Sequence, residues 1–249
     1  MAALHDMHCH LDFIANGTDV AAEAARAGTL LFANTVTPEG WTAAREAFGS
    51  FANVVVGFGL HPWWVGGAGD AERACALLEE HDPTAIGEIG LDLGRRHAET
   101  AAFQRDAFTR ILAWAANRGG KLISIHSVHA AAEALDAVES SGAAESCSCI
   151  FHWFTGPSDQ LKRAVDLGCY FSFGTRALAT GQGREYVKAV PANRLLLETD
   201  FPPQQGQSCS YTELRDELSR VAEAIAAIKG EEALETMAAT TTRLMHSAS

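Results

Sequence analysis

The stretch Ala-Ile-Gly-Glu-Ile-Gly-Leu, residues 85–91, decides the fold that this chain is expected to adopt. The run is short, and apolar or glycine residues occupy every position except Glu88. A strand that is apolar on both faces is typical of a parallel sheet covered by helices. The stretch therefore predicts a buried strand that carries one unusual carboxylate.

Similar short apolar runs recur along the chain, and longer segments with helical periodicity lie between them. The expected strands are residues 6–11, 30–35, 54–59, 85–91, 122–126, 149–153, 169–173 and 195–199. The clearest expected helices are residues 100–118, 130–139, 159–167, 211–228 and 231–245.

One of these helices shows its buried face in the sequence. Within residues 100–118, an apolar stripe at helical spacing comprises Phe103, Phe108, Ile111, Leu112 and Trp114. Glycines stand where several helices should end, as is usual for helix C-termini: Gly28, Gly119, Gly142 and Gly168.

Strands that alternate with helices indicate an α/β fold with a parallel sheet. The chain has 249 residues, a length typical of a (β/α)8 barrel of the TIM type. No repeat or Pro/Ser-rich linker interrupts it. We therefore expect a distorted (β/α)8 barrel that forms a single domain over residues 1–249.

Composition limits the partners and the compartment. The formal net charge is −12 at pH 7, which argues against a basic face that coats duplex DNA. The six cysteines form no CxxC pair, and free thiols without an apparent leader favour the cytoplasm. No apolar run approaches the ~18 residues of a membrane span, so we expect no membrane partner. A monomer is the default expectation.

Metal-ligand residue types fall at the carboxyl ends of the expected strands. They are His8 and His10 after the first strand, Glu88 in the fourth, His126 in the fifth, His152 in the sixth and Asp200 in the eighth. Because barrel active sites gather at this rim, the six side chains are expected to meet.

Spacing supports a metal site. His8 and His10 are two residues apart in a strand, so both imidazoles face the same side while Cys9 faces the other. Four imidazoles and two carboxylates suffice for two divalent ions. Such a pair can activate a water molecule and neutralise charge on a leaving oxygen.

Each residue also has a structural interpretation. A lone His10 or His152 is more often a hydrogen-bonded core histidine. Glu88 could be an ion-pair partner, and Asp200 could be a turn residue before Phe201. The coincidence of all six at strand ends favours metal binding.

The same residues lie in motifs that occur together in one protein family. The motifs are Asp6-Met7-His8-Cys9-His10, Gly59-Leu60-His61-Pro62, Gly87-Glu88-Ile89-Gly90-Leu91-Asp92, Ile125-His126-Ser127, Phe151-His152-Trp153-Phe154 and Glu198-Thr199-Asp200-Phe201-Pro202. In this order, the sequence resembles the TatD family of metal-dependent deoxyribonucleases, within the amidohydrolase superfamily.

The resemblance implies a hydrolase that cleaves phosphodiester bonds of DNA, acting from an end, with two divalent ions (Zn, Mg or Mn). It implies one ion held by His8, His10 and Asp200, a second held by His126 and His152, and Glu88 as the bridge. Asp200 could also take the proton from the attacking water.

Three further residues have open roles. His61 would donate a hydrogen bond to the substrate or brace a loop. Asp92 would orient a histidine or a loop from outside the ligand set. Glu198 is two residues before Asp200 and is expected to be a buried structural partner.

The chain departs from the family around the ligands. Val128 stands where an arginine is usual, Leu93-Gly94 where an aromatic pair is common, and Thr242 where an asparagine is usual. Trp153 follows His152 in place of the usual cysteine.

Other residues are candidates to compensate for these departures. Arg95, Arg96 and Arg176 are candidates to restore positive charge. The pair Trp63-Trp64 would either stack on a base or pack a loop.

Two other functions stay open. The same ligands could serve hydrolysis of a small ester, amide or lactone, which the acidic charge and the missing arginine would suit. A non-catalytic metal-binding or scaffold protein would bind metal without turnover.

Overall fold

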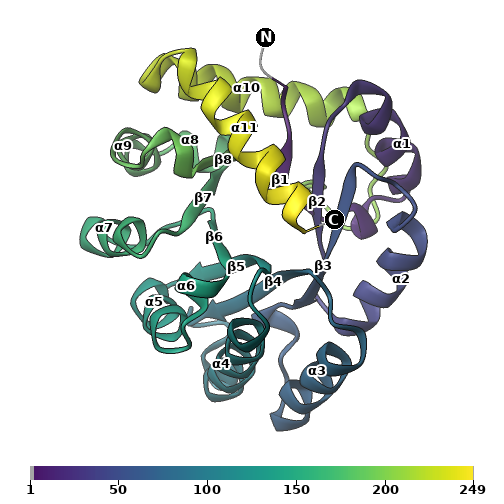
Figure 1. Cartoon of the computed structure of the whole chain (residues 1–249), viewed down its shortest axis with the longest axis vertical. Helices are drawn as coiled ribbons and strands as arrows, with labels where there is room; N and C mark the ends of the chain where they lie inside the picture. Colours follow the sequence, from purple (N-terminus) through teal and green to yellow (C-terminus); the bar gives the residue numbers. More distant parts are fainter. Residues whose placement is uncertain (1–2, 249) are drawn as a thin grey trace.

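The structure, a computed structural model, describes residues 3–248. All eight strands are parallel and follow one another in chain order around a barrel, with helices on the outside (Figure 1). The strands are β1 (Asp6–Cys9), β2 (Leu31–Asn34), β3 (Val54–Leu60), β4 (Ala85–Asp92), β5 (Leu122–Val128), β6 (Ser148–His152), β7 (Tyr170–Phe173) and β8 (Leu195–Leu197).

Helices connect the strands. The α-helices are α1 (Gly17–Ala27), α2 (Pro38–Phe48), α3 (Ala68–His81), α4 (Ala101–Arg118), α5 (Ala131–Ser140), α6 (Ala143–Ser146), α7 (Ser158–Asp166), α8 (Thr175–Leu178), α9 (Gly181–Ala189), α10 (Tyr211–Lys229) and α11 (Glu232–Ser247). Short 3-10 helices are η1 (Leu11–Phe13), η2 (Pro62–Trp64), η3 (Ala98–Thr100) and η4 (Ala192–Arg194). None of the described helices is both long and apolar enough to cross a bilayer.

The predicted (β/α)8 barrel and all eight predicted strands are confirmed. The predicted stripe of α4 is wrong at one position, because Phe103 is 38% exposed. The next residue, Gln104, is buried instead. Its side chain accepts the Asp92 N–H at 3.0 Å and donates to the His97 carbonyl at 3.1 Å, so a polar link replaces an apolar contact.

Hydrogen bonds beyond the end of β8 join the last strand to the first. The Asp200 N–H donates to the His8 carbonyl at 2.9 Å, and the His10 N–H donates to the Phe201 carbonyl at 2.7 Å. The buried Asp6 carboxylate accepts from the backbone and hydroxyl of Thr199 at 3.1 and 2.5 Å. These hydrogen bonds between β1 and the segment after β8 place His8, His10 and Asp200 side by side.

Helix α11, yellow in Figure 1, lies across the strands instead of around them. Leu244 and Met245 of α11 pack into a cluster with residues near the amino ends of the strands, including Met7, Phe32 and Leu122. The helix thereby covers the end of the barrel opposite the rim where β1, β4, β5 and β6 deliver their polar residues. The rim is left free for chemistry.

Strands β4 and β5 approach closely at one glycine. Gly90 pairs with His126 across the ladder and has φ +146°, a conformation that side-chain-bearing residues rarely adopt. A Cβ built on Gly90 would lie 2.0 Å from the His126 carbonyl oxygen. Glycine at this position therefore sets where β5 presents His126.

We expect Gly90→Ala to lower the free energy of unfolding by ~3 kcal/mol or more, because backbone strain and overpacking add. Urea denaturation of wild type and variant measures the change. Gly69→Ala is the matched control, since a Cβ there meets nothing within 4 Å. Equal stability of Gly90→Ala and wild type would contradict the close approach.

Candidate metal centre

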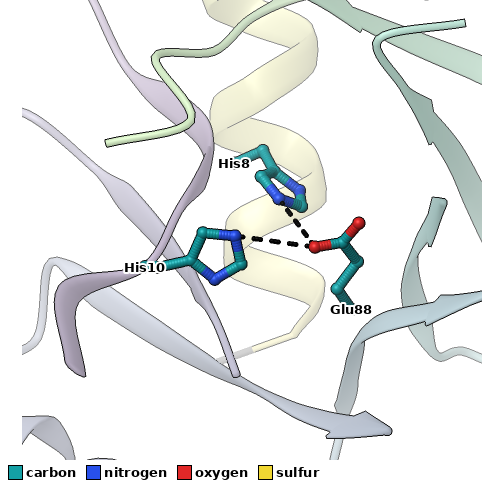
Figure 2. A group of neighbouring side chains, drawn as sticks. All are labelled: His8, His10 and Glu88. Atoms are coloured by element: carbon teal, nitrogen blue, oxygen red, sulfur yellow. Dashed lines mark ion pairs between the residues drawn. The ribbon is translucent and has the colours of Figure 1, made fainter. Parts of the chain in front are cut away.

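The Glu88 carboxylate lies at the centre of the rim and is 2% exposed. Its Oε2 atom faces the two imidazoles that end β1, with His8 Nε2 at 3.3 Å and His10 Nε2 at 3.5 Å. Figure 2 shows both rings pointing at this single oxygen. The three ligand atoms lie within 4.8 Å of one another, close enough to hold one metal ion.

The other oxygen of Glu88 faces a different set of imidazoles. Its Oε1 atom lies 2.7 Å from His126 Nδ1, 3.2 Å from His152 Nε2 and 3.4 Å from His61 Nε2. His61, Glu88 and His126 form a second group whose ligand atoms lie within 4.8 Å of one another. The carboxylate thus separates two groups of nitrogens, one on each oxygen.

The outer ring nitrogens of the β1 histidines are held by neighbouring strands. His10 Nδ1 lies 2.9 Å from the Asn34 carbonyl oxygen, and His8 Nδ1 lies 2.9 Å from Ser124 Oγ. A carbonyl only accepts, so His10 Nδ1 carries the proton. In neutral His10 the lone pair of Nε2 then faces Glu88, the orientation that a metal ligand needs.

Buried carboxylates stand behind the other two histidines. Glu198 Oε2 lies 3.4 Å from His152 Nδ1 and accepts the Ser172 hydroxyl at 2.5 Å. Asp92 Oδ2 lies 3.8 Å from His126 Nε2. A carboxylate on the far nitrogen of an imidazole orients the ring and makes it a stronger ligand.

His61 has a different hydrogen-bond pattern. Its Nδ1 accepts the Trp63 N–H at 3.1 Å and therefore carries no proton. In the neutral ring the proton then sits on Nε2, which points toward Glu88. Burial lowers the pKa of His61 to about 4, so the ring is neutral at physiological pH. This tautomer makes His61 a donor into the site and a poor metal ligand.

Asp200 follows β8 in a left-handed conformation, with φ +55°, that is uncommon for a residue other than glycine. Its Oδ1 lies 3.5 Å from His10 Nε2, and its Oδ2 accepts from Arg176 at 3.2 Å. A cavity of about 210 Å³ opens beside it, lined by residues that include Trp153, Arg176 and Phe201. Asp200 therefore lies between the cavity and the histidines that surround Glu88.

The buried carboxylate of Glu88 is ionised and needs positive charge nearby. Burial opposes ionisation of Glu88, yet the imidazoles of His61, His152 and His8 hold its pKa well below the usual range. Despite burial, Asp200 and Glu88 raise the pKa of His10 to about 8. An ionised carboxylate this deeply buried needs such compensation.

Divalent cations would supply that charge, and the donors fit them. The buried nitrogen His8 Nε2, which faces Glu88, has no hydrogen-bond partner among the described residues. Imidazole and carboxylate donors suit zinc and related divalent ions.

The structure thus brings His8, His10, Glu88, His61, His126, His152 and Asp200 together at one rim. It places Asp92 and Glu198 behind His126 and His152, as the sequence suggested. Ser124 and Ser172, which contact His8 and Glu198, were not predicted from the sequence. Each serine lies between two apolar residues of a buried strand, and that is the signal that could have found them.

Proteins of one family match this chain over most of its length. The family model described as "TatD related DNase" matches residues 5–246. The chain is 32% identical to the uncharacterized metal-dependent hydrolase YcfH of Escherichia coli K12, and the match covers 98% of this chain and 96% of that protein. It is also 32% identical to the 3'-5' ssDNA/RNA exonuclease TatD of Klebsiella pneumoniae, over 74% of this chain and 71% of the relative.

A solved structure shares the fold. The TatD homolog YJJV from Escherichia coli superposes with a TM-score of 0.76 at 21% identity, and the match covers 97% of both chains. The sequence match spans the strands that carry the histidines and both carboxylates, and the barrel matches over nearly its full length. The chain therefore belongs to the TatD family of metal-dependent hydrolases.

Proposed function

We propose that this enzyme hydrolyses phosphodiester bonds of DNA from a strand end, with two divalent ions. His8, His10 and Asp200 would hold one ion, His126 and His152 the other, and Glu88 would bridge them. One observation carries the proposal: each oxygen of Glu88 faces its own group of imidazole nitrogens. A carboxylate that served only as an ion-pair partner would not need nitrogens divided between its two oxygens.

Two ions at these positions would lower the pKa of a water molecule and neutralise charge on the phosphoryl oxygens. The chain's own groups supply the proton transfers. Burial raises the pKa of Asp200, but His10, His152 and His8 outweigh it and leave the carboxylate ionised at neutral pH. In that form it accepts the proton of the attacking water. His61 Nε2–H donates a hydrogen bond to an oxygen of the substrate.

DNA is the proposed substrate because of the relatives and the rim. The matching family is described as DNases, and the Klebsiella relative is named a single-stranded DNA and RNA exonuclease. Arg176, 53% exposed at its side chain, stands beside Asp200 where a phosphate would approach. It supplies positive charge at a rim from which the arginine expected near Val128 is missing.

Metal analysis tests the ligand assignment. Wild-type protein purified without chelator should contain about two divalent ions per chain, and His126→Ala about one, because the variant loses a ligand of one ion only. His246→Ala, at an exposed position of α11, is the control and should keep the wild-type content. An unchanged metal content in His126→Ala contradicts the assignment.

A second variant separates a hydrogen-bond donor from a metal ligand. We expect His61→Gln to keep the wild-type metal content and to lower kcat by ~10²-fold, as loss of a donor to a developing charge does. Metal content and steady-state kinetics on one preparation measure both. A variant that loses an ion would instead make His61 a ligand.

The substrate class is tested with oligonucleotides and an ester and lactone panel. Wild type should release mononucleotides from single-stranded DNA with Zn, Mg or Mn, and Glu88→Ala should lose at least ~10³-fold, because both ions depend on this carboxylate. Glu80→Ala, at an exposed position of α3, should match wild type. Turnover of esters or lactones with inert DNA and RNA would refute the proposed substrate.

A further inference from the structure

Two neighbouring tryptophans are exposed beside the metal centre. Trp63 is 53% exposed and Trp64 43%, and both belong to η2, directly after β3 and His61. Large hydrophobic side chains are otherwise covered, since among the described residues only Phe103 is similarly exposed. Loop packing would bury such rings, so their exposure needs another explanation.

The two indoles lie nearly parallel to each other. Their planes differ by 20° with ring centroids 6.3 Å apart, and Trp63 also lies parallel to His97, at 5.1 Å and 9°. The Trp63 indole N–H donates to Asp92 Oδ2 at 2.6 Å. A polar anchor thus fixes the orientation of Trp63 while much of its surface stays open.

This surface adjoins the catalytic groups. The His61 ring lies 5.1 Å from Trp63 and 5.4 Å from Trp64, and the His126 ring lies 6.2 Å from Trp63. On the other side, Phe13 connects Trp64, at 6.5 Å, with His10, at 5.3 Å. A group on the indoles therefore lies next to His61 and His126, two of the histidines that contact Glu88.

Unpaired positive charge lies in the loop that carries His97. Among the described Lys and Arg side chains, only Arg26, Arg95 and Arg96 have no hydrogen bond, ion pair or ring contact. Arg95 and Arg96 are exposed and directly precede His97. In a protein with a net charge of −12, two adjacent unpaired arginines beside an aromatic surface favour an anionic, planar ligand.

We propose that Phe13, Trp63, Trp64 and His97, with Arg95 and Arg96, form a subsite for an unpaired nucleotide of the substrate strand. The base stacks on the indoles, and the adjacent phosphates meet the two arginines. This aromatic subsite rests on the proposed nuclease function and deepens it. In a duplex both faces of a base are already stacked, so the subsite selects single-stranded ends.

Binding of single-stranded DNA tests the subsite. The probe is fluorescein-labelled, phosphorothioate-linked decathymidylate, followed by anisotropy with the metal-loaded enzyme. We expect Trp64→Ala to weaken binding about tenfold, the loss of one stacked base, and Trp64→Phe to restore most of it. The double variant Arg95→Ala/Arg96→Ala should weaken binding and lower the slope of log Kd against log salt by about 1.4, for two phosphates.

Matched controls exist for both classes of variant. Phe103→Ala removes an exposed aromatic ring that makes no ring contact with the subsite. Arg26→Ala removes the other unpaired arginine, in the last turn of α1. Both should bind the probe as wild type does. A chain of abasic tetrahydrofuran residues, which has phosphates but no bases, should bind wild type and Trp64→Ala equally.

The outcomes separate the two proposals. If wild type degrades single-stranded DNA but Trp64→Ala binds the probe as tightly as wild type, the subsite is refuted and the nuclease function stands. A loss that is equal on the abasic chain also refutes base stacking. If wild type neither binds nor degrades DNA, the proposed function fails and the subsite falls with it.

Discussion

The burial of one carboxylate organises this protein. Glu88 lies within a strand that is buried on both faces, where an unpaired anion would be costly. Imidazoles from four strands, or from the residues directly after them, surround this carboxylate: His8 and His10 of β1, His61 after β3, His126 of β5 and His152 of β6. The parallel barrel brings these side chains, which are distant in sequence, together at one rim, so the charge compensation of Glu88 depends on the fold.

Around that carboxylate, hydrogen bonds to the outer ring nitrogens assign each histidine its role. In the neutral ring, the carbonyl that accepts from His10 Nδ1 leaves Nε2 of His10 unprotonated, whereas the Trp63 N–H that donates to His61 Nδ1 leaves Nε2 of His61 protonated. Chemically identical side chains thus become a candidate ligand and a donor. Asp92 connects the histidines to the exposed tryptophans, because its carboxylate lies near His126 and accepts the indole N–H of Trp63. The groups that would bind metal and the surface that would bind a base are therefore positioned by one network.

The strands and most of the candidate site could be predicted from the sequence. The spacing of apolar residues indicates which segments are buried, and polar residues at the ends of those segments indicate the site. The strands were found from apolar runs, and the candidate ligands from polar residues at strand ends. Phe103 was misplaced because a polar contact of Gln104 with the Asp92 N–H overrode the apolar stripe. The tautomer of His61 depends on a backbone N–H two residues away, and the covering of the barrel by α11 depends on packing between chain ends. Neither leaves a periodic signal.

The acidic surface bears on how such an enzyme would choose its substrate. A net charge of −12 repels a polyanion at a distance, so long-range attraction cannot hold duplex DNA. In the proposed function, affinity would then come from short-range contacts at the rim: ions at Glu88, Arg176 beside Asp200, and the stacking surface of Trp63 and Trp64. Stacking needs a free base face, which strand ends and single strands offer and duplex interiors do not. If the proposed function holds, the negative charge would be part of the specificity, because it would remove non-specific binding that competes with the proposed preference for unpaired nucleotides.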